Sequence, residues 1–299
     1  MDAREPEFLT VGRLIDRCEE VLTAAALHYG HGTDNARDEA AALVVAACGL
    51  RHDDPALYRR HVDAGSRRRI EEFLRRRIDE RLPLPYVTGE AWFAGLPFHV
   101  DRRVLIPRSP FAELIRQRFQ PWLGRVEPRR ILEIGTGSAC IAIACALAFP
   151  GARVVATDIS PAALAVAARN VARHRVGDRV QLLATDVDAG LRGEFDLLLS
   201  NPPYVPEAEL DRLPPEYRCE PRLGLASGPD GMALPRRVVA AAARLLAPTG
   251  WLAIEVGAWG ADLQAAFPGL PFIWPELVQG GEGIALLPAA ELAAQECVE

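Results

Sequence analysis

An alternation of short apolar runs with longer helical runs, beginning at residue 129, constrains the fold more than any other feature. Parallel strands covered on both faces read as short, nearly continuous apolar runs, and each needs a long crossover to reach the next. The alternation therefore predicts an α/β domain with helices on both faces of a parallel sheet. We expect strands at 130–134, 153–157, 180–184, 196–200 and 250–255, and helices at 138–149 and 161–174. Apolar runs at 272–274 and 284–287 would complete a seven-stranded sheet as an antiparallel pair.

The chain before residue 84 has helical periodicity instead. Apolar residues recur every three or four positions, which predicts helices within 10–30, 33–50 and 66–82. Thr10 and Gly30 are expected to bound the first helix, and Thr33 or Asp34 to cap the second. Two prolines, at 83 and 85, are expected to end the third helix.

A hairpin is expected to link the two regions. Runs of aromatic and β-branched residues lie on either side of Ala94-Gly95, as in a β-hairpin. Ser109 and Pro110 then suit the start of a helix. We therefore expect a small N-terminal helical domain at 1–84, a β-hairpin linker at 85–108 and the α/β domain at 109–299.

Composition narrows the class of protein. No apolar run approaches the roughly 20 residues that cross a bilayer, and the N-terminus has no apolar signal region, so we expect a cytoplasmic protein. The net charge of −6 disfavours a protein that binds by coating a nucleic-acid backbone, so no direct DNA binding is expected. The six cysteines are never spaced as C-x-x-C, so neither a metal site nor a disulfide framework is expected.

Ligands of parallel sheets bind beyond the carboxyl ends of the strands, so the residues after each strand are functional candidates. Gly135 and Gly137 follow the first strand and permit a tight turn that a ligand can approach, although helix-to-sheet packing also favours glycine. Asp158 follows the second strand, about twenty residues beyond the glycines, where a ribose-binding carboxylate is expected. We favour that role over a helix cap, because Ser160 suits the cap better. Asp186 follows the third strand and suits either an adenine amino group or an ordinary loop.

The fourth strand ends in Asn201-Pro202-Pro203-Tyr204. Proline fixes its own φ, has no N–H and disfavours helix at the residue before it, so this segment is stiff and extended. The Asn201 side-chain oxygen and the Pro202 carbonyl remain as acceptors for a planar nitrogen that carries hydrogens. Tyr204 is expected to pack against the flat amide of a substrate. A plain strand-ending turn is the alternative, and the order of the preceding motifs disfavours it.

These motifs in this order resemble those of S-adenosylmethionine-dependent methyltransferases that modify planar amino or amide nitrogens, which have a Rossmann-like fold. The resemblance covers about residues 105–290, and Asn-Pro-Pro-Tyr is its most specific part. That element is shared by enzymes acting on DNA bases and on protein glutamine. Three further segments, 86–115, 214–232 and 271–287, resemble the protein glutamine N5-methyltransferases. The loop from Ile106 to Pro110 resembles the branch acting on protein three of the large ribosomal subunit (uL3), whereas the release-factor branch typically has Glu where Phe111 stands.

The resemblance implies methyl transfer from S-adenosylmethionine to a glutamine side-chain amide of uL3, which is the expected partner. It leaves open whether uL3 is taken free or within an assembling ribosomal particle. The implied catalytic residues are Asn201, Pro202, Pro203 and Tyr204. Arg108 would either order a substrate loop or cap the domain interface. The implied cofactor-binding residues are Glu133, Gly135, Thr136, Gly137, Ser138, Asp158, Ile159, Asp186, Val187 and Asn201.

One residue departs from the family pattern. Ala139 stands where the family usually has glycine, and its methyl group is compatible with cofactor binding if the local φ is negative. Three other functions stay open: a release factor glutamine methyltransferase, a DNA adenine methyltransferase and a non-catalytic ribosome-assembly factor. The acidic charge disfavours the DNA enzyme. By position and resemblance, the helical domain is expected to recognise the protein substrate.

Overall fold

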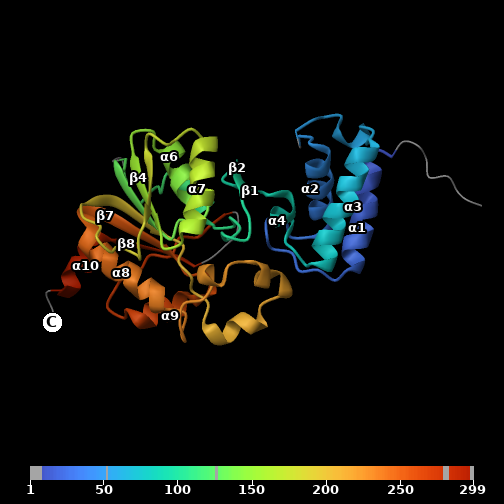
Figure 1. Ribbon diagram of the computed structural model, residues 1–299. Coiled ribbons are helices and arrows are strands. Elements are labelled where there is room, and N and C mark those ends of the chain that lie inside the picture. The colour runs from blue at the N-terminus through green and yellow to red at the C-terminus, as the bar shows by residue number, and fades with distance from the viewer. Residues whose placement is uncertain (1–8, 52, 125–126, 279–282, 297–299) are drawn as a thin grey trace, which may run out of the picture. The chain divides into compact units, whose positions relative to one another are not determined.

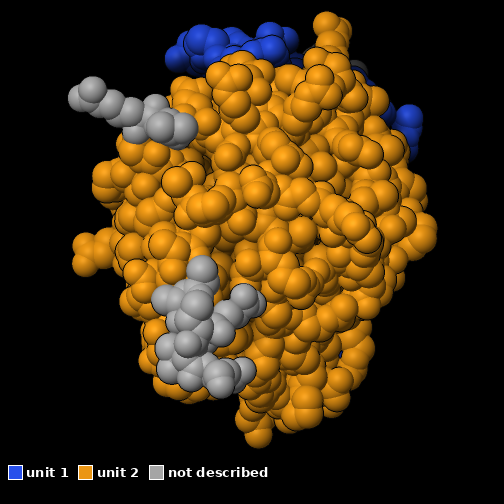
Figure 2. Space-filling view, turned by 90° about the vertical axis from the view of Figure 1, so that its left-hand side faces the viewer, with its two compact units in different colours: residues 1–90, 214–219 blue, residues 91–213, 220–299 orange. Residues whose placement is uncertain are grey.

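The computed structural model describes residues 9–51, 53–124, 127–278 and 283–296. The chain divides into two compact units, drawn in different colours in Figure 2. Unit 1 comprises residues 1–90 and 214–219, and unit 2 comprises residues 91–213 and 220–299. Residues 214–219, which the sequence placed in the α/β domain, therefore belong to the helical unit instead.

Unit 1 is built from helices (Figure 1). Thr10 caps the first of them, as predicted, by accepting a hydrogen bond from the Arg13 N–H. That helix ends well before Gly30, and Asn35 rather than Thr33 or Asp34 caps the second. The Thr33 hydroxyl instead donates to Glu39. The prolines after the third helix start a short fourth helix. The helices are α1 (Val11–Ala24), α2 (Ala36–Cys48), the 3-10 turn η1 (Leu57–Arg59), α3 (Ala64–Asp79) and α4 (Leu84–Thr88).

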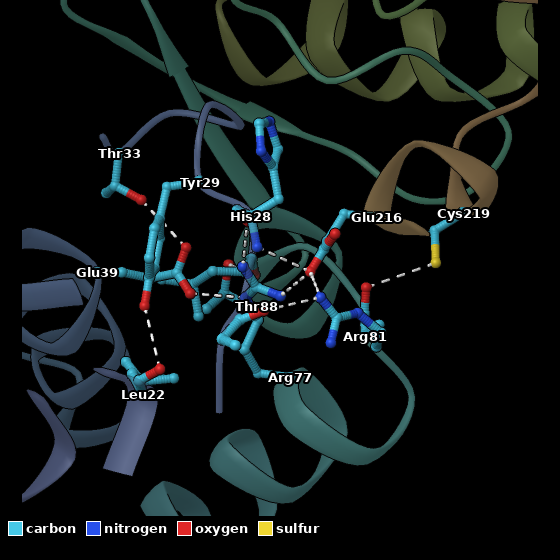
Figure 3. A network of polar contacts seen from close by, with 12 residues as sticks. Leu22, His28, Tyr29, Thr33, Glu39, Arg77, Arg81, Thr88, Glu216 and Cys219 are labelled. Atoms are coloured by element: carbon cyan, nitrogen blue, oxygen red, sulfur yellow. Dashed lines mark hydrogen bonds and ion pairs between the residues drawn. The ribbon is translucent and has the colours of Figure 1, made fainter. Parts of the chain in front are cut away.

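A buried network of charges explains why residues 214–219 pack in unit 1 (Figure 3). The Arg77 guanidinium donates to Glu39 Oε1 at 2.6 Å and to the His28 carbonyl at 2.8 Å, and its Nη1 lies 3.4 Å from Glu216 Oε1. The Nη2 atom of Arg81 lies 2.9 Å from the same oxygen. The Arg77 and Glu216 side chains are 1% and 0% exposed. Glu216 therefore attaches the 214–219 segment to α3 and to the chain that follows it.

Unit 2 contains a six-stranded sheet among the described residues, in the order β5-β4-β3-β6-β7-β8. Neighbouring strands from β5 to β7 are parallel, and β8 is antiparallel to β7. The predicted α/β fold with a central parallel sheet is confirmed. The strands are β3 (Arg130–Ile134), β4 (Arg153–Asp158), β5 (Val180–Ala184), β6 (Phe195–Ser200), β7 (Leu246–Glu255) and β8 (Ile284–Pro288).

The expected seventh strand, at 272–274, forms only an isolated antiparallel bridge between Ile273 and Leu286. Pro271 and Pro275 bracket this segment and have no N–H groups with which to extend the ladder. The sheet therefore ends in a two-residue contact at this edge.

Helices cover both faces of the sheet (Figure 1). One apolar core includes α5 (Phe111–Arg116), α6 (Cys140–Ala148) and α7 (Pro161–Arg173). The other includes α8 (Ala233–Leu245), α9 (Gly260–Ala266) and α10 (Ala289–Glu296). Three 3-10 turns lie in the loops of unit 2: η2 (Glu207–Arg212), η4 (Arg222–Gly224) and η5 (Gly257–Trp259). A further one, η3 (Pro215–Cys219), lies in the 214–219 segment of unit 1.

The predicted hairpin is confirmed as β1 (Glu90–Phe93) and β2 (Leu96–His99). Both turn residues, Ala94 and Gly95, have positive φ, which suits the right-handed twist of the two strands. Asn170 of α7 exchanges two hydrogen bonds with the backbone of His99, and it also donates to the Ser138 carbonyl at 2.9 Å. The hairpin and the loop after β3 are thus attached to the same buried side chain.

Across the described ranges, no helix is long and apolar enough to cross a membrane. In the same residues, no cluster of His, Cys, Asp and Glu has the arrangement of a metal site.

Candidate active site

Unit 2 has a cavity of about 270 Å³ beyond the carboxyl ends of its parallel strands. The loops after β3, β4, β5 and β6 all contribute to its walls, as predicted for a sheet of this kind. Two segments that do not follow a strand, 103–109 and 221–224, complete the lining. Of the predicted cofactor-binding residues, all line the cavity: Glu133, Gly135, Thr136, Gly137, Ser138, Asp158, Ile159, Asp186, Val187 and Asn201.

The loop after β3 follows the predicted tight turn. Gly135 and Gly137 have φ values of 76° and 54°, in the left-handed region that glycine adopts without strain. Ala139 also lies there, with φ 63° and ψ 25°. The condition of a negative φ is therefore not met, because the turn into α6 has a left-handed residue at this position. Such a conformation costs a non-glycine residue about 1 kcal/mol.

Asp158 holds the turn and the start of α7 together. Its carboxylate accepts from the Gly137 N–H and from the Ser160 N–H, both at 2.8 Å. Ser160 caps α7, as predicted, by accepting from the Ala163 N–H. A carboxylate has about four acceptor sites, so Asp158 keeps capacity for a ligand hydroxyl at the cavity wall.

The loop after β5 carries Asp186 and Val187 to the cavity. Asp186 pairs with Arg237 of α8 at 2.9 Å, and both side chains are about half exposed. Val187 has a φ of 56°, which is a strained value for a β-branched residue. Arg237 lines the same cavity and was not found from the sequence, because the pair joins segments about fifty residues apart. Strained residues concentrate at ligand sites, so Ala139 and Val187 mark this one.

Glu133 is buried beneath the glycine turn. Its carboxyl group accepts from the Thr136 hydroxyl at 2.5 Å and from the Ala142 N–H at 3.0 Å. Burial raises the pKa of Glu133 to about 8, against the lowering effect of these two hydrogen bonds, and the charge of Asp158 adds to the rise. One donor belongs to the turn and the other to α6, so this carboxyl joins the loop to the start of α6.

The segment after β6 divides between the cavity and the core. Asn201 and Pro203 line the cavity, whereas Pro202 and Tyr204 are not among its lining residues. The Tyr204 ring instead packs on Gly257, where a Cβ atom would lie 3.1–3.2 Å from two ring atoms and the hydroxyl oxygen. It also contacts the core beneath α8 and is partly buried. That Tyr204 packs against the substrate amide stays a prediction.

Two carboxylates that the sequence did not single out hold the segment 106–109. Glu220 forms a two-pronged ion pair with Arg108, at 2.7 and 2.8 Å, and accepts from the Ile106 N–H at 3.0 Å. Glu255, the last residue of β7, accepts a hydrogen bond from the Ser109 hydroxyl. Arg108 therefore orders the loop within unit 2. Extending the inspection of strand ends to β7 would have found Glu255.

The geometry on these loops defines a class of protein: a parallel α/β sheet with this order of glycine turn, acidic residues and Asn-Pro-Pro-Tyr is that of S-adenosylmethionine-dependent methyltransferases. The family model described as "Methyltransferase small domain" matches residues 114–212. The solved structure of the hMettl16 catalytic domain, in complex with a MAT2A 3'UTR hairpin, has the same fold. It gives a TM-score of 0.50 at 16% identity, over 77% of this chain and 84% of that one.

Curated relatives show to which family of methyltransferases the chain is similar. Proteins named "Ribosomal protein uL3 glutamine methyltransferase" from Bordetella pertussis and Xanthomonas campestris pv. campestris are each 44% identical to this chain. The alignments cover 96% and 98% of this chain and 97% and 95% of those proteins. The Francisella tularensis protein of the same name is 40% identical over 91% of this chain and 87% of its own length. The chain belongs to the ribosomal protein uL3 glutamine methyltransferase family.

Proposed function

We propose that the chain transfers the methyl group of S-adenosylmethionine to the side-chain amide nitrogen of a glutamine in uL3. The relatives in the functional family carry that activity in their names. The observation that carries the proposal is the position of Asn201: it lines the same cavity as the glycine turn, Asp158 and Asp186. Cofactor and target amide would therefore meet at the end of β6.

The residues of the cavity fit S-adenosylmethionine. A Cβ atom added at Gly135 or Gly137 would meet no atom within 4 Å, so the space beside the turn is open to a ligand. Asp158 would hold the ribose hydroxyls, and Asp186 with Val187 would border the adenine. When bound, the cofactor supplies an electrophilic methyl group, and the protein supplies binding and orientation.

The target nitrogen is a poor nucleophile, because its lone pair is delocalised into the amide carbonyl. The Asn201 Oδ1 atom and the Pro202 carbonyl would accept hydrogen bonds from its two N–H groups and hold it in line with the methyl group. Positioning of this kind lowers a barrier by roughly 7–11 kcal/mol in ideal cases. No base is required before transfer, since the methylated nitrogen can release its proton to water afterwards.

Unit 1 would recognise the protein substrate. In this proposal residues 1–84 bind the substrate, 85–108 link the two parts, and 109–299 transfer the methyl group. This role is inferred from its position before the methyltransferase unit and from the length of the family alignments, which include it. A cytoplasmic location is part of the proposal, and a ribosomal-protein substrate supports it.

A release factor is the competing substrate, and Phe111 at the end of the 106–110 loop favours uL3. The deciding experiment offers purified uL3 and purified release factor, side by side, to the enzyme with labelled S-adenosylmethionine, and locates the label by mass spectrometry. Label on a uL3 glutamine alone supports the proposal. Label on the release factor alone keeps the chemistry and replaces the substrate. Duplex DNA is offered as a third substrate, and label on it would favour a DNA adenine methyltransferase. Calorimetry with S-adenosylmethionine tests the non-catalytic assembly factor, which need not bind the cofactor.

A further inference from the structure

Glu255 lies beside the proposed catalytic asparagine. Strands β6 and β7 are parallel neighbours, and Ser200 pairs with Ile254 in their register. The next residue on each strand is Asn201 on one and Glu255 on the other, so the two face each other where the sheet ends. Glu255 is only 5% exposed. A buried carboxyl at this position needs partners, and the Asn201 side chain is one of its hydrogen-bonding partners.

The other contacts of Glu255 fix its orientation. The Ser109 hydroxyl donates to Glu255 Oε2, while the Ser109 oxygen accepts from the Phe111 N–H at 3.1 Å. The serine proton is thus committed to the carboxyl group. Two residues further on, Gly257 supports the Tyr204 ring at the end of the Asn-Pro-Pro-Tyr segment. The end of β7 therefore contacts both ends of that segment.

Few charged or titratable groups face Glu255. From the 103–109 segment Arg108 acts on it, from the segment after β6 Tyr204 does, and β8 places the apolar Ile284 opposite. Burial raises the pKa of Glu255 to about 7. The Ser109 hydrogen bond, the Arg108 charge and hydrogen bonds with Asn201 and Tyr204 act in the opposite direction and lower this pKa. Both protonation states are thus populated near neutral pH.

An asparagine amide presents an oxygen on one side and an NH₂ group on the other. An ionised carboxylate can only accept, so it selects the NH₂ side. We propose that Glu255 is a positioning residue for methyl transfer, whose carboxylate accepts a hydrogen bond from Asn201 Nδ2 and so turns Asn201 Oδ1 toward the substrate cavity. This inference rests on the proposed function, in which Oδ1 holds the target nitrogen. A protonated Glu255 has an O–H donor as well as an acceptor, so it no longer selects the NH₂ side and permits the reversed amide, which turns NH₂ groups of enzyme and substrate against each other.

The kinetic test compares Glu255→Gln with the wild type, with uL3 as substrate. In the wild type, kcat should rise with pH through about 7 and then level off. Glu255→Gln should lower kcat at pH 8 by about 10-fold or more, remove the rise, and leave the Kd for S-adenosylmethionine within about threefold. Glu113→Gln is the matched control, because Glu113 is also buried in unit 2 and lies outside the cavity. Its kcat should keep the wild-type rise.

A second variant keeps the inference falsifiable if Glu255→Gln does not fold. Ser109→Ala removes one hydrogen bond to the carboxylate, so the midpoint of the kcat profile should move to higher pH. A wild-type profile in either variant, or an unmoved midpoint in Ser109→Ala, overturns the inference.

A measurement without substrate separates this inference from the proposed function. In ¹⁵N-labelled enzyme saturated with S-adenosylmethionine, the side-chain NH₂ signal of Asn201, assigned by its loss in Asn201→Ala, should titrate with pH. The titration should be absent in Glu255→Gln. If it occurs but no uL3 glutamine is methylated, the substrate proposal fails and the Glu255 contact stands. If uL3 is methylated but Asn201 does not titrate, the Glu255 inference fails alone.

Discussion

Unit 1 and unit 2 differ in how they hold four of their buried glutamates. In unit 1, Glu216 and Glu39 lie against the guanidinium group of Arg77, and Arg81 also contacts Glu216. In unit 2, Glu220 is likewise paired with an arginine, but Glu133 and Glu255 are held by hydroxyl and backbone donors instead. The consequences are opposite. Burial favours the neutral form of Glu216, but the His28 N–H and the two arginines outweigh it and lower the pKa.

For Glu133 and Glu255, burial prevails and raises the pKa to about 8 and about 7. At Glu216 the backbone N–H donors, with the two arginines added, outweigh burial, whereas the donors around Glu133 and Glu255 do not. Unit 1 uses permanently paired charges to hold a segment in place. Unit 2 keeps carboxyls whose protonation changes near neutral pH at the edge of its cavity.

The largest expected effect comes from breaking the pairing in unit 1. Arg77→Met leaves Glu39 and Glu216 buried without their shared cation, which should cost about 3–5 kcal/mol of unfolding free energy. Arg75→Met is the matched control, since Arg75 is exposed and its pair with Glu80 is a surface one, so the change should stay within about 0.5 kcal/mol. Urea denaturation measures both. Equal effects in the two variants would contradict a structural role for the network.

The pH dependence of stability should have opposite signs in the two units. Because the pKa of Glu255 is raised from about 4.5 to about 7, folding is favoured by proton binding, and that stability is lost as pH rises through this window. One pKa unit corresponds to about 1.4 kcal/mol, so Glu255 should contribute about 3 kcal/mol. Glu255→Gln and Glu133→Gln should each flatten the loss in urea titrations between pH 5 and 8.

Glu216 should behave in the reverse sense, since its pKa is lowered in the folded state. Its stabilising contribution is present above the ordinary pKa of a glutamate and is lost as pH falls below it. Glu216→Gln should therefore flatten the acid side of the stability profile, below about pH 4.5, and leave the interval from pH 5 to 8 unchanged. Loss of the dependence in the neutral interval would show that the units do not differ as described.

Removing the Asn201 side chain, which Glu255 is proposed to orient, should affect turnover and not stability. Asn201→Ala is expected to lower turnover at least tenfold, about 1.4 kcal/mol of barrier, because one acceptor for the target nitrogen is lost. Unfolding free energy and cofactor affinity should change little. Turnover close to that of the wild type would exclude the proposed role of Asn201.

The smallest expected effect concerns backbone strain beside Glu133. Ala139→Gly relieves a left-handed alanine but adds freedom to the unfolded chain, so a net stabilisation of about 0.5–1 kcal/mol is expected. The thermal midpoint should rise by a few degrees, with cofactor affinity equal or better. A lower midpoint would mean that the Ala139 methyl group contributes more through packing than it costs in strain.

Local patterns predicted much of the fold and the main site. The strand runs at 130–134 and 180–184 were found to the residue, because apolar periodicity and turn residues act between neighbours in sequence. Asp158 and Asn201 were found because parallel strands end at a common edge. The cap at Asn35, where Thr33 or Asp34 was expected, shows the limit of this reasoning, since several polar residues near a helix start compete for one cap.

The order of the loops around the cavity was thus encoded in the chain's own periodicity, and the motifs on those loops carried its resemblance to a methyltransferase family. The partner of each of these buried polar groups was decided only by the tertiary structure. Arg77 meets Glu216 across 139 residues of sequence, Arg108 meets Glu220 across 112, and Ser109 meets Glu255 across 146. No local pattern specifies such a pair, because the approach of two distant side chains depends on how whole elements pack. Those pairings decide which carboxyls are charged, and so what the site can do.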